Sequence, residues 1–199
     1  MDVAQARTTM KLIYHGFFPT VWMLFLGYWL ISAGWVKRTK ESDPLGAQIV
    51  HVVLTVFSGA LVLSPAFRDG ALGWWFLPPN KATFFAGAAI LIAGLAFAVW
   101  ARIHLGRNWS STVTLKEGHR LIRSGPYRLV RHPIYTGLIS GVAGTAIASG
   151  EVRAAIAVVL LTVAFLFKSK REEQFMVKEF GDQYVQYQKE VGAFVPFLR

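Results

Sequence analysis

Residues 125–137 read Gly125-Pro-Tyr-Arg-Leu-Val-Arg-His-Pro-Ile-Tyr-Thr-Gly137, a basic and aromatic segment that runs directly into an apolar stretch ending near Ser149. Proline suits the first turn of a helix, where its missing N–H has no partner to lose. Pro133 therefore predicts that a helix starts here, with His132 at or beside its N-cap. Because a helix N-terminus attracts anions, Arg131 and His132 are placed to bind a negatively charged group. A basic segment that only marks a membrane boundary would have the same composition.

The composition is that of a membrane protein. Of the 199 residues, 54% are hydrophobic and only 16% are charged, and the mean hydropathy is +0.42, which is too apolar for an ordinary soluble domain. The net charge of +10 could suggest a nucleic-acid partner, but the basic residues collect at the ends of apolar runs, so we exclude that class of partner. The chain has no cysteine, and its histidines lack ligand-like spacing, so no metal site is predicted.

Five apolar runs predict an all-α integral membrane protein with about five transmembrane helices. The first three are long enough for a crossing, which needs roughly 20 helical residues. The last two are shorter and only four residues apart, so we interpret them as a tight helical hairpin that spans the membrane, with a re-entrant hairpin as the alternative. Arg153 and Lys168 would snorkel at the two ends of the fifth run. The runs cover residues 14–36, 47–67, 82–103, 133–149 and 154–167.

Lysine and arginine concentrate in three regions, which the positive-inside rule places together on the cytoplasmic side. With five crossings, the N-terminus is predicted outside and the C-terminus inside. No linker or low-complexity tract interrupts residues 1–199, so a single domain is expected. The basic regions contain Lys37, Arg38 and Lys40; Arg102, Arg107, Lys116, Arg120, Arg123, Arg128 and Arg131; and Lys168, Lys170 and Arg171.

The C-terminal segment predicts a helix that leaves the membrane. Residues 168–180 contain neither glycine nor proline, so the fifth helix should continue beyond the bilayer and end or bend at Gly181. Tyr184, Tyr187 and Val191 then recur at intervals of three and four residues, which predicts a short amphipathic helix on the cytoplasmic side. The apolar end of the chain can fold back over the mouth of the bundle.

Two adjacent carboxylates, Glu172 and Glu173, stand about one turn from the predicted membrane boundary. Read alone, they predict a solvated ion-pair cluster with the cations around them. Beside Arg131 and His132, the same residues could form a polar cup. Because successive residues of a helix differ by about 100°, only one of the two glutamates should face that cup, and we favour Glu172.

Together, these segments resemble the isoprenylcysteine carboxyl methyltransferase family of integral membrane enzymes, over about the last half of the chain. The resemblance implies that residues 105–199 bind S-adenosylmethionine, that residues 1–104 contribute three N-terminal spans, and that a lipophilic or prenyl-type acceptor enters from the bilayer. The chain lacks the additional N-terminal spans of eukaryotic members, so a bacterial-type member in a bacterial inner membrane is expected. The matching residues are those from Ser124 to Gly137, Arg171-Glu172-Glu173, Phe180-Gly181-Asp182-Gln183-Tyr184, Tyr187 and Pro196.

The chemistry of these side chains suits the cofactor that the resemblance implies. A carboxylate can be held by Arg131 and the helix start, aromatic rings can form a wall, and a glutamate can accept from the ribose or the amino group. Methyl transfer is an in-line displacement that requires alignment rather than a metal. Arg131 and Glu172 are the predicted catalytic residues, and the predicted cofactor-binding residues are Gly125, Tyr127, His132, Tyr135, Glu172 and Glu173.

Two other classes of membrane protein share parts of this pattern. Membrane sterol and steroid reductases, which use NADPH, share a similar Arg-His-Pro-x-Tyr element, although Arg171-Glu172-Glu173 and Phe180-Gly181 favour the methyltransferases. A non-enzymatic membrane scaffold is the third possibility. A carboxylate acceptor is favoured, but Glu190-Val191-Gly192 stands where a basic residue is usual in enzymes that methylate prenylcysteine, so a hydroxyl, amine or thiol acceptor also stays open.

Two further features receive structural interpretations. Gly137, Gly141 and Gly144 form a stripe on the fourth predicted helix, which we interpret as a helix-packing surface. A polar residue inside a span is a functional candidate by default, but we interpret His51 as a hydrogen-bonded packing histidine.

Overall fold

The computed structural model describes residues 3–33, 39–42, 44–67, 69–78, 80–106, 109, 114–116 and 121–198, with only the backbone described for residues 3–15, 39–42, 65 and 114–116. Four of the basic residues on which the predicted orientation rests, Lys37, Arg38, Arg107 and Arg120, lie outside these ranges.

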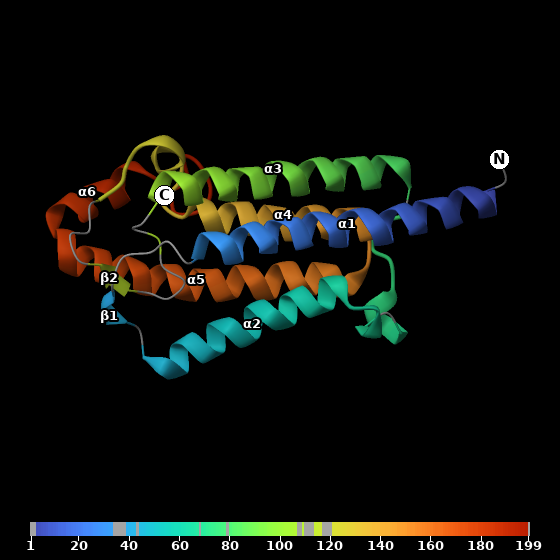
Figure 1. The fold of residues 1–199 in the computed structure, drawn as a ribbon, viewed down its shortest axis with the longest axis horizontal. Coiled ribbons are helices and arrows are strands. Elements are labelled where there is room, and N and C mark those ends of the chain that lie inside the picture. Colours follow the sequence, from blue (N-terminus) through green and yellow to red (C-terminus); the bar gives the residue numbers. More distant parts are fainter. Residues whose placement is uncertain are drawn as a thin grey trace.

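Five long helices form an antiparallel bundle, and the two ends of the chain lie at opposite ends of it (Figure 1). Their positions confirm an all-α membrane fold, with each helix close to one predicted run. A short sixth helix, α6, follows α5 directly. The helices are α1 (Val3–Ala33), α2 (Leu45–Leu63), α3 (Lys81–Leu105), α4 (Pro133–Ser149), α5 (Val152–Phe180) and α6 (Asp182–Glu190).

Within the described residues, four helices are long and apolar enough to cross a membrane: α1, α2, α3 and α5. Helix α4 has 17 residues, which corresponds to about 25 Å against a hydrocarbon core of about 30 Å. It packs on α3 and α5, and most of its residues are buried. Because protein surrounds α4, its length need not match the bilayer.

Helix α5 is longer than its apolar run because its polar continuation is also helical. It extends to Phe180, and Gly181, with φ of 54°, separates it from α6. This confirms the predicted helical extension and the break at Gly181. Two short strands that the sequence did not predict, β1 (Thr39–Ser42) and β2 (Thr114–Lys116), pair antiparallel beside α5. Short 3-10 turns complete the described chain: η1 (Pro65–Phe67), η2 (Gly70–Gly73) and η4 (Gly125–Arg128).

Glycines bring the backbones of α3 and α4 into direct contact. A Cβ atom on Gly144 would lie 2.5 Å from both the carbonyl oxygen of Gly87 and the backbone nitrogen of Leu91. Gly137 approaches Gly94 in the same way. The interpretation of the glycine stripe as a packing surface is confirmed, and this contact fixes the helix that carries His132.

We therefore expect Gly144→Ala to destabilise the bundle by about 1–3 kcal/mol, because backbone atoms cannot move aside for the new methyl group. Gly141→Ala is the matched control, since its Cβ would meet the side chain of Leu95 at 3.1 Å. Thermal unfolding of the two detergent-purified variants checks this expectation. Equal melting temperatures would contradict it.

Arg153 does not snorkel, so that prediction is wrong. Its side chain is fully buried and pairs with Glu151, and its guanidinium donates to the carbonyls of Val62 and Ser64 at 3.3 and 3.0 Å. The last carbonyls of a helix have no partner within the helix. Arg153 supplies donors for these carbonyls at the end of α2, which the apolar pattern of the sequence could not reveal.

Candidate active site

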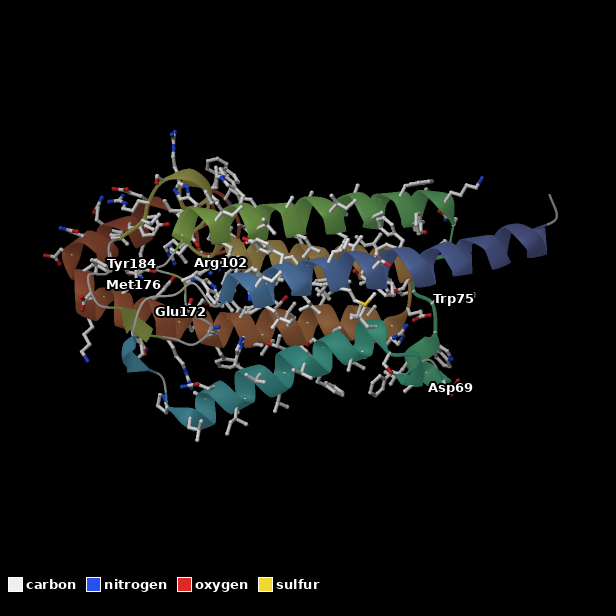
Figure 2. The ribbon with its side chains drawn as sticks, in the orientation of Figure 1. Asp69, Trp75, Arg102, Glu172, Met176 and Tyr184 are labelled. Carbon is white, nitrogen blue, oxygen red and sulfur yellow. The ribbon has the colours of Figure 1, made fainter. Side chains whose placement is uncertain are left out.

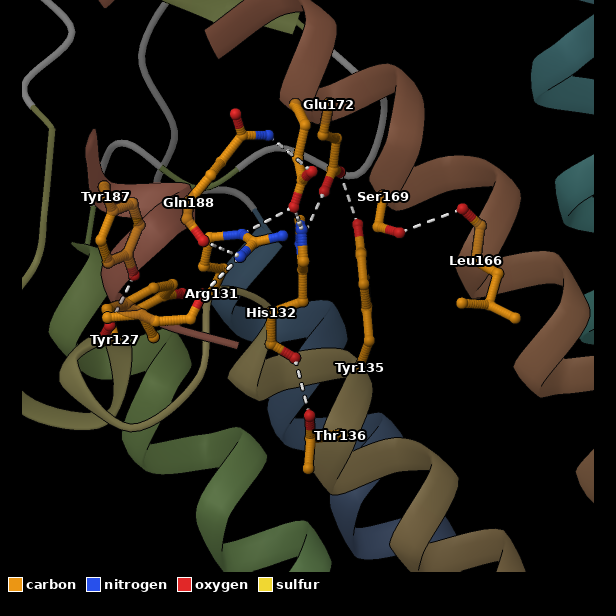
Figure 3. Close-up of polar contacts among 12 residues, drawn as sticks. Tyr127, Arg131, His132, Tyr135, Thr136, Leu166, Ser169, Glu172, Tyr187 and Gln188 are labelled. Carbon is orange, nitrogen blue, oxygen red and sulfur yellow. Dashed lines mark hydrogen bonds and ion pairs between the residues drawn. The ribbon is translucent and has the colours of Figure 1, made fainter. Parts of the chain in front are cut away.

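A cluster of polar side chains occupies the end of the bundle where α5 extends into α6. Figure 2 places Glu172, Met176 and Tyr184 at this end, and Asp69 and Trp75 at the opposite one. The members come from the start of α4, the polar part of α5 and the last turn of α6, and are linked through hydrogen bonds or ion pairs (Figure 3). We call this set the polar cluster: Arg131, His132, Tyr135, Glu172, Glu173 and Gln188.

The start of α4 is built as its proline predicts, and the C-terminal tail closes on it. His132 is the N-cap and Pro133 stands in the first turn. The backbone N–H groups of Arg131 and His132 donate to the carbonyls of Gly192 and Ala193 at 2.9 and 3.0 Å. The fold-back of the tail is therefore confirmed, and it uses N–H groups ahead of the helix that an incoming anion would otherwise be free to bind.

His132 lies between two carboxylates and two aromatic rings. Its Nε2 is 2.9 Å from Oε1 of Glu173, and its Nδ1 is 3.5 Å from Oε2 of Glu172. The imidazole stacks on Tyr135 and Phe194, with ring centroids 5.6 and 5.5 Å apart. Burial by itself would lower the pKa of His132, but the hydrogen bonds and charges of the two glutamates outweigh it and raise the pKa. Protonation of both ring nitrogens would therefore satisfy both carboxylates.

This arrangement predicts a pH dependence. Because the pKa of His132 is raised above its ordinary value of 6.5, its contribution to stability is complete below pH 6.5 and is lost as the pH rises through the raised pKa. We therefore expect the difference in unfolding temperature between wild type and His132→Gln to shrink as the pH rises through the raised pKa of His132. A difference that stays constant or grows with pH would contradict the assignment of an imidazolium.

Arg131 joins α5 to the end of α6. Its Nε donates to Oε1 of Glu173 at 2.8 Å, and its Nη1 donates to the carbonyls of Gln188, at 3.1 Å, and Val191. The amide of Gln188 donates to Oε2 of Glu173 at 2.9 Å. The guanidinium thus satisfies carbonyls at the end of α6 that have no helical partner. Arg131 therefore has a structural role in the polar cluster, separate from any role in binding an anion.

Glu172 has fewer strong protein partners than Glu173. The hydroxyl of Tyr135 donates to Glu172 at 2.5 Å, and the Lys168 ammonium lies 5.4 Å from the centre of the Tyr135 ring. The prediction that only one glutamate faces the site is wrong. An imidazole has nitrogens on two sides, so consecutive residues of α5 can flank His132 despite their angular separation.

Gly125 and Tyr127 shape the turn that leads into the cluster rather than joining its ion pairs. Gly125 has φ of 58°, and a Cβ there would lie 2.8 Å from the ring of His104. Tyr127 is buried, and its carbonyl accepts a hydrogen bond of 2.5 Å from the hydroxyl of Tyr187. Burial raises the pKa of Tyr187 to about 12, which keeps the phenol protonated as a donor.

The structure therefore places two of the predicted site residues, Gly125 and Tyr127, in the turn that precedes the polar cluster. It brings the other five together in that cluster: Arg131, His132, Tyr135, Glu172 and Glu173. Sequence reasoning missed Gln188 and Phe194. Gln188 stands four residues after Tyr184 on α6, so the amphipathic repeat carried a signal for it. Phe194 belongs to the apolar tail and carried no chemical signal of its own.

The sequence profile of the phospholipid methyltransferase family matches residues 82–183, about half of the chain and most of the polar cluster. The chain belongs to this family. Its resemblance to the isoprenylcysteine carboxyl methyltransferases is confirmed by similar proteins. Protein-S-isoprenylcysteine O-methyltransferase B of Arabidopsis thaliana is 32% identical over 117 residues, which are 56% of this chain and 58% of that protein.

Two further comparisons agree. The probable protein-S-isoprenylcysteine O-methyltransferase of Oryza sativa subsp. indica is 27% identical over 128 residues, 63% of this chain and 64% of that protein. This phospholipid methyltransferase family member thus matches somewhat less than two thirds of the length of these plant relatives. The structure of the eukaryotic intramembrane Ras methyltransferase ICMT shares the fold, with a TM-score of 0.50 and 24% identity, over 79% of this chain and 55% of that one.

Proposed function

We propose that the protein transfers a methyl group from S-adenosylmethionine to the carboxylate of a lipophilic acceptor of the isoprenylcysteine type. The polar cluster is the observation that carries this proposal, because it sets carboxylates, cations and aromatic rings at one end of a membrane bundle. The similar proteins are methyltransferases, and no observation favours the reductase or scaffold alternatives.

The side chains of the polar cluster fit the groups of S-adenosylmethionine. Glu172 suits a cationic group, because its contacts with the Tyr135 hydroxyl at 2.5 Å and the His132 imidazole at 3.5 Å are fewer and, at His132, longer than the three direct hydrogen bonds of Glu173. Aromatic faces beside Glu172 also favour cations. Arg131 and His132 place positive charge where the carboxylate of the cofactor or of the acceptor could bind. When bound, S-adenosylmethionine supplies a methyl group on a positively charged sulfur.

The side chains at the site then have to orient the acceptor carboxylate and exclude water from it, and they do not have to move a proton. A carboxylate acceptor is already ionised, so its attack requires no general base. The charges of Arg131 and His132 would hold it in line. The stacked rings of Tyr135, Phe165 and Phe194 would keep water away from the reacting atoms.

A methyl-transfer assay tests the proposed function. Detergent-purified protein is incubated with methyl-labelled S-adenosylmethionine and an S-prenylated N-acetylcysteine, and we expect a base-labile methyl ester. The matched control replaces the free carboxylate of the acceptor by a carboxamide, which should take up no label. Equal labelling of both compounds, or of neither, would contradict a carboxylate acceptor.

We further propose that the polar cluster faces the cytoplasm, with the N-terminus on the opposite side, in a bacterial inner membrane. The chain lacks cysteine, so single cysteines can report sidedness. Gln183 and Asp69 are exposed residues near opposite ends of the bundle. We expect an impermeant maleimide to label Asp69→Cys in intact cells but Gln183→Cys only in inverted vesicles. The reverse pattern would overturn this orientation.

A further inference from the structure

His51 and Thr55 stand one turn apart on α2, which packs on α5. The ring of His51 lies 5.6 Å from that of Phe165, and its imidazole interacts with the backbone of Ala164. Among the described residues, however, the Nδ1 atom of His51 and the hydroxyl oxygen of Thr55 are buried without a hydrogen-bond partner. The interpretation of His51 as a hydrogen-bonded packing histidine therefore accounts for its contacts with Ala164 and Phe165, but not for its Nδ1 atom.

The missing bond of Thr55 differs from the behaviour of most other threonine and serine hydroxyls in the described helices. A serine or threonine inside a membrane helix commonly donates to the carbonyl four residues earlier. Within the described helices, five hydroxyls do so: those of Thr20, Ser58, Thr136, Thr145 and Thr162. The hydroxyl of Thr55 makes no such bond to the carbonyl of His51, which stands four positions earlier. This hydroxyl is left for another partner.

His51 lies close to the proposed reaction site. Phe165 contacts His51 on one side and stacks on Tyr135 on the other, with ring centroids 4.4 Å apart. Tyr135 in turn donates to Glu172. One phenyl ring thus separates His51 from the polar cluster, and Thr55 stands on the next turn of α2. An unpaired polar atom in an apolar setting costs free energy, and polar residues inside a span commonly mark a substrate path.

We propose that His51 and Thr55 bind the uncharged amide group that neighbours the reacting carboxylate of the acceptor. This inference rests on the proposed function and names the part of the acceptor that α2 recognises. Residues four apart on a helix have Cβ atoms about 5–6 Å apart, a spacing that suits an amide whose N–H and C=O point in opposite directions. Because the other ring nitrogen of His51 donates to the backbone of Ala164, Nδ1 is the acceptor and takes the N–H of the amide, while the hydroxyl of Thr55 donates to its C=O.

Helix α2 lies at the surface of the bundle that faces the bilayer, because Val50, Val52 and Val53, which flank His51, are exposed. The side chains of His51 and Thr55 are half-buried, and α2 diverges from α5 toward its N-terminal end (Figure 1). Rotation of His51 and Thr55 about their first side-chain torsion would present the two polar atoms to a ligand arriving along this helix. The amide would replace the missing protein partners.

The experiment compares two acceptors on full-length protein: an S-prenylated N-acetylcysteine, and the matching S-prenylated 3-mercaptopropionate, which keeps the thioether and carboxylate but lacks the amide. We expect wild type to have about a tenfold higher KM for the compound without the amide, since one to two neutral hydrogen bonds are lost. His51→Phe and Thr55→Val should lose this preference, so that both acceptors give the higher KM. Ser58→Ala, on the same helix, is the control and should keep the preference, because Ser58 already bonds to Leu54.

The outcomes separate the two proposals. Variants that keep the wild-type preference for the amide would overturn the role of His51 and Thr55 while leaving the proposed function intact. Methylation of neither acceptor by wild type would remove the proposed acceptor and the inference together. The affinity for S-adenosylhomocysteine, measured on each variant, reports whether the variant is folded. A loss of that affinity together with the preference would assign these residues to the stability of the bundle and overturn a role in acceptor binding.

Discussion

Replacing Arg131 by alanine is expected to abolish methyl transfer and to destabilise the folded protein by about 3–5 kcal/mol, the usual effect of breaking a buried ion pair. The Arg131 and Glu173 side chains are only 10% and 15% exposed, so removal of the guanidinium leaves a poorly hydrated carboxylate. It also removes the donor to the carbonyls of Gln188 and Val191. Thermal unfolding in detergent measures the loss of stability, and a methyl-transfer assay on the same preparation measures the loss of activity.

Arg128→Ala is the matched control, because Arg128 is an exposed arginine in the same basic segment and should lose neither activity nor stability. Arg131→Lys should also fail, since an ammonium cannot bridge a carboxylate and two carbonyls with the planar fork of a guanidinium. If Arg131→Ala unfolded and reacted as wild type does, Arg131 would only mark the membrane boundary.

The second large effect separates the two glutamates. Glu172→Gln is expected to weaken binding of S-adenosylhomocysteine at least tenfold with little change in stability, because a charge-assisted hydrogen bond to a ligand contributes about 1.5–3 kcal/mol. Glu173→Gln should instead mainly lower the unfolding temperature, since its carboxylate pairs with Arg131, His132 and Gln188. Calorimetric titration and thermal unfolding of both variants measure the contrast.

The two substitutions control for each other, as they make the same chemical change at adjacent positions. Wild-type affinity in Glu172→Gln would remove this carboxylate from the cofactor site. A Glu173→Gln protein with wild-type stability would contradict the description of Glu173 as the anchor of the cluster.

The sequence was sufficient to predict the five long helices because each contains an apolar run of about the right length. It also predicted the junction at His132 and Pro133 and the break at Gly181, since proline and glycine have strong local preferences. The pairing of β1 with β2 could not be predicted. These short polar strands come from connections far apart in the chain, and their own sequences do not alternate in hydrophobicity.

The members of the polar cluster were largely predictable, but their pairing was not. Arg131, His132 and the two glutamates stand in recognisable motifs, whereas the partner of each depends on how α4, α5 and the tail pack together. The angular argument for a single inward glutamate considered α5 alone and overlooked the two nitrogens of His132. Gln188 and Phe194 enter the site because the chain folds back through α6 and the tail, whose carbonyls accept hydrogen bonds from the backbone N–H groups of Arg131 and His132.

Calorimetric titration of the detergent-purified wild-type protein with S-adenosylhomocysteine, and in parallel with NADPH, tests the central claim most directly. The account predicts saturable binding of S-adenosylhomocysteine, weakened at least tenfold in Glu172→Gln, and no binding of NADPH. Binding of NADPH without binding of S-adenosylhomocysteine would contradict it and assign the polar cluster to a reductase.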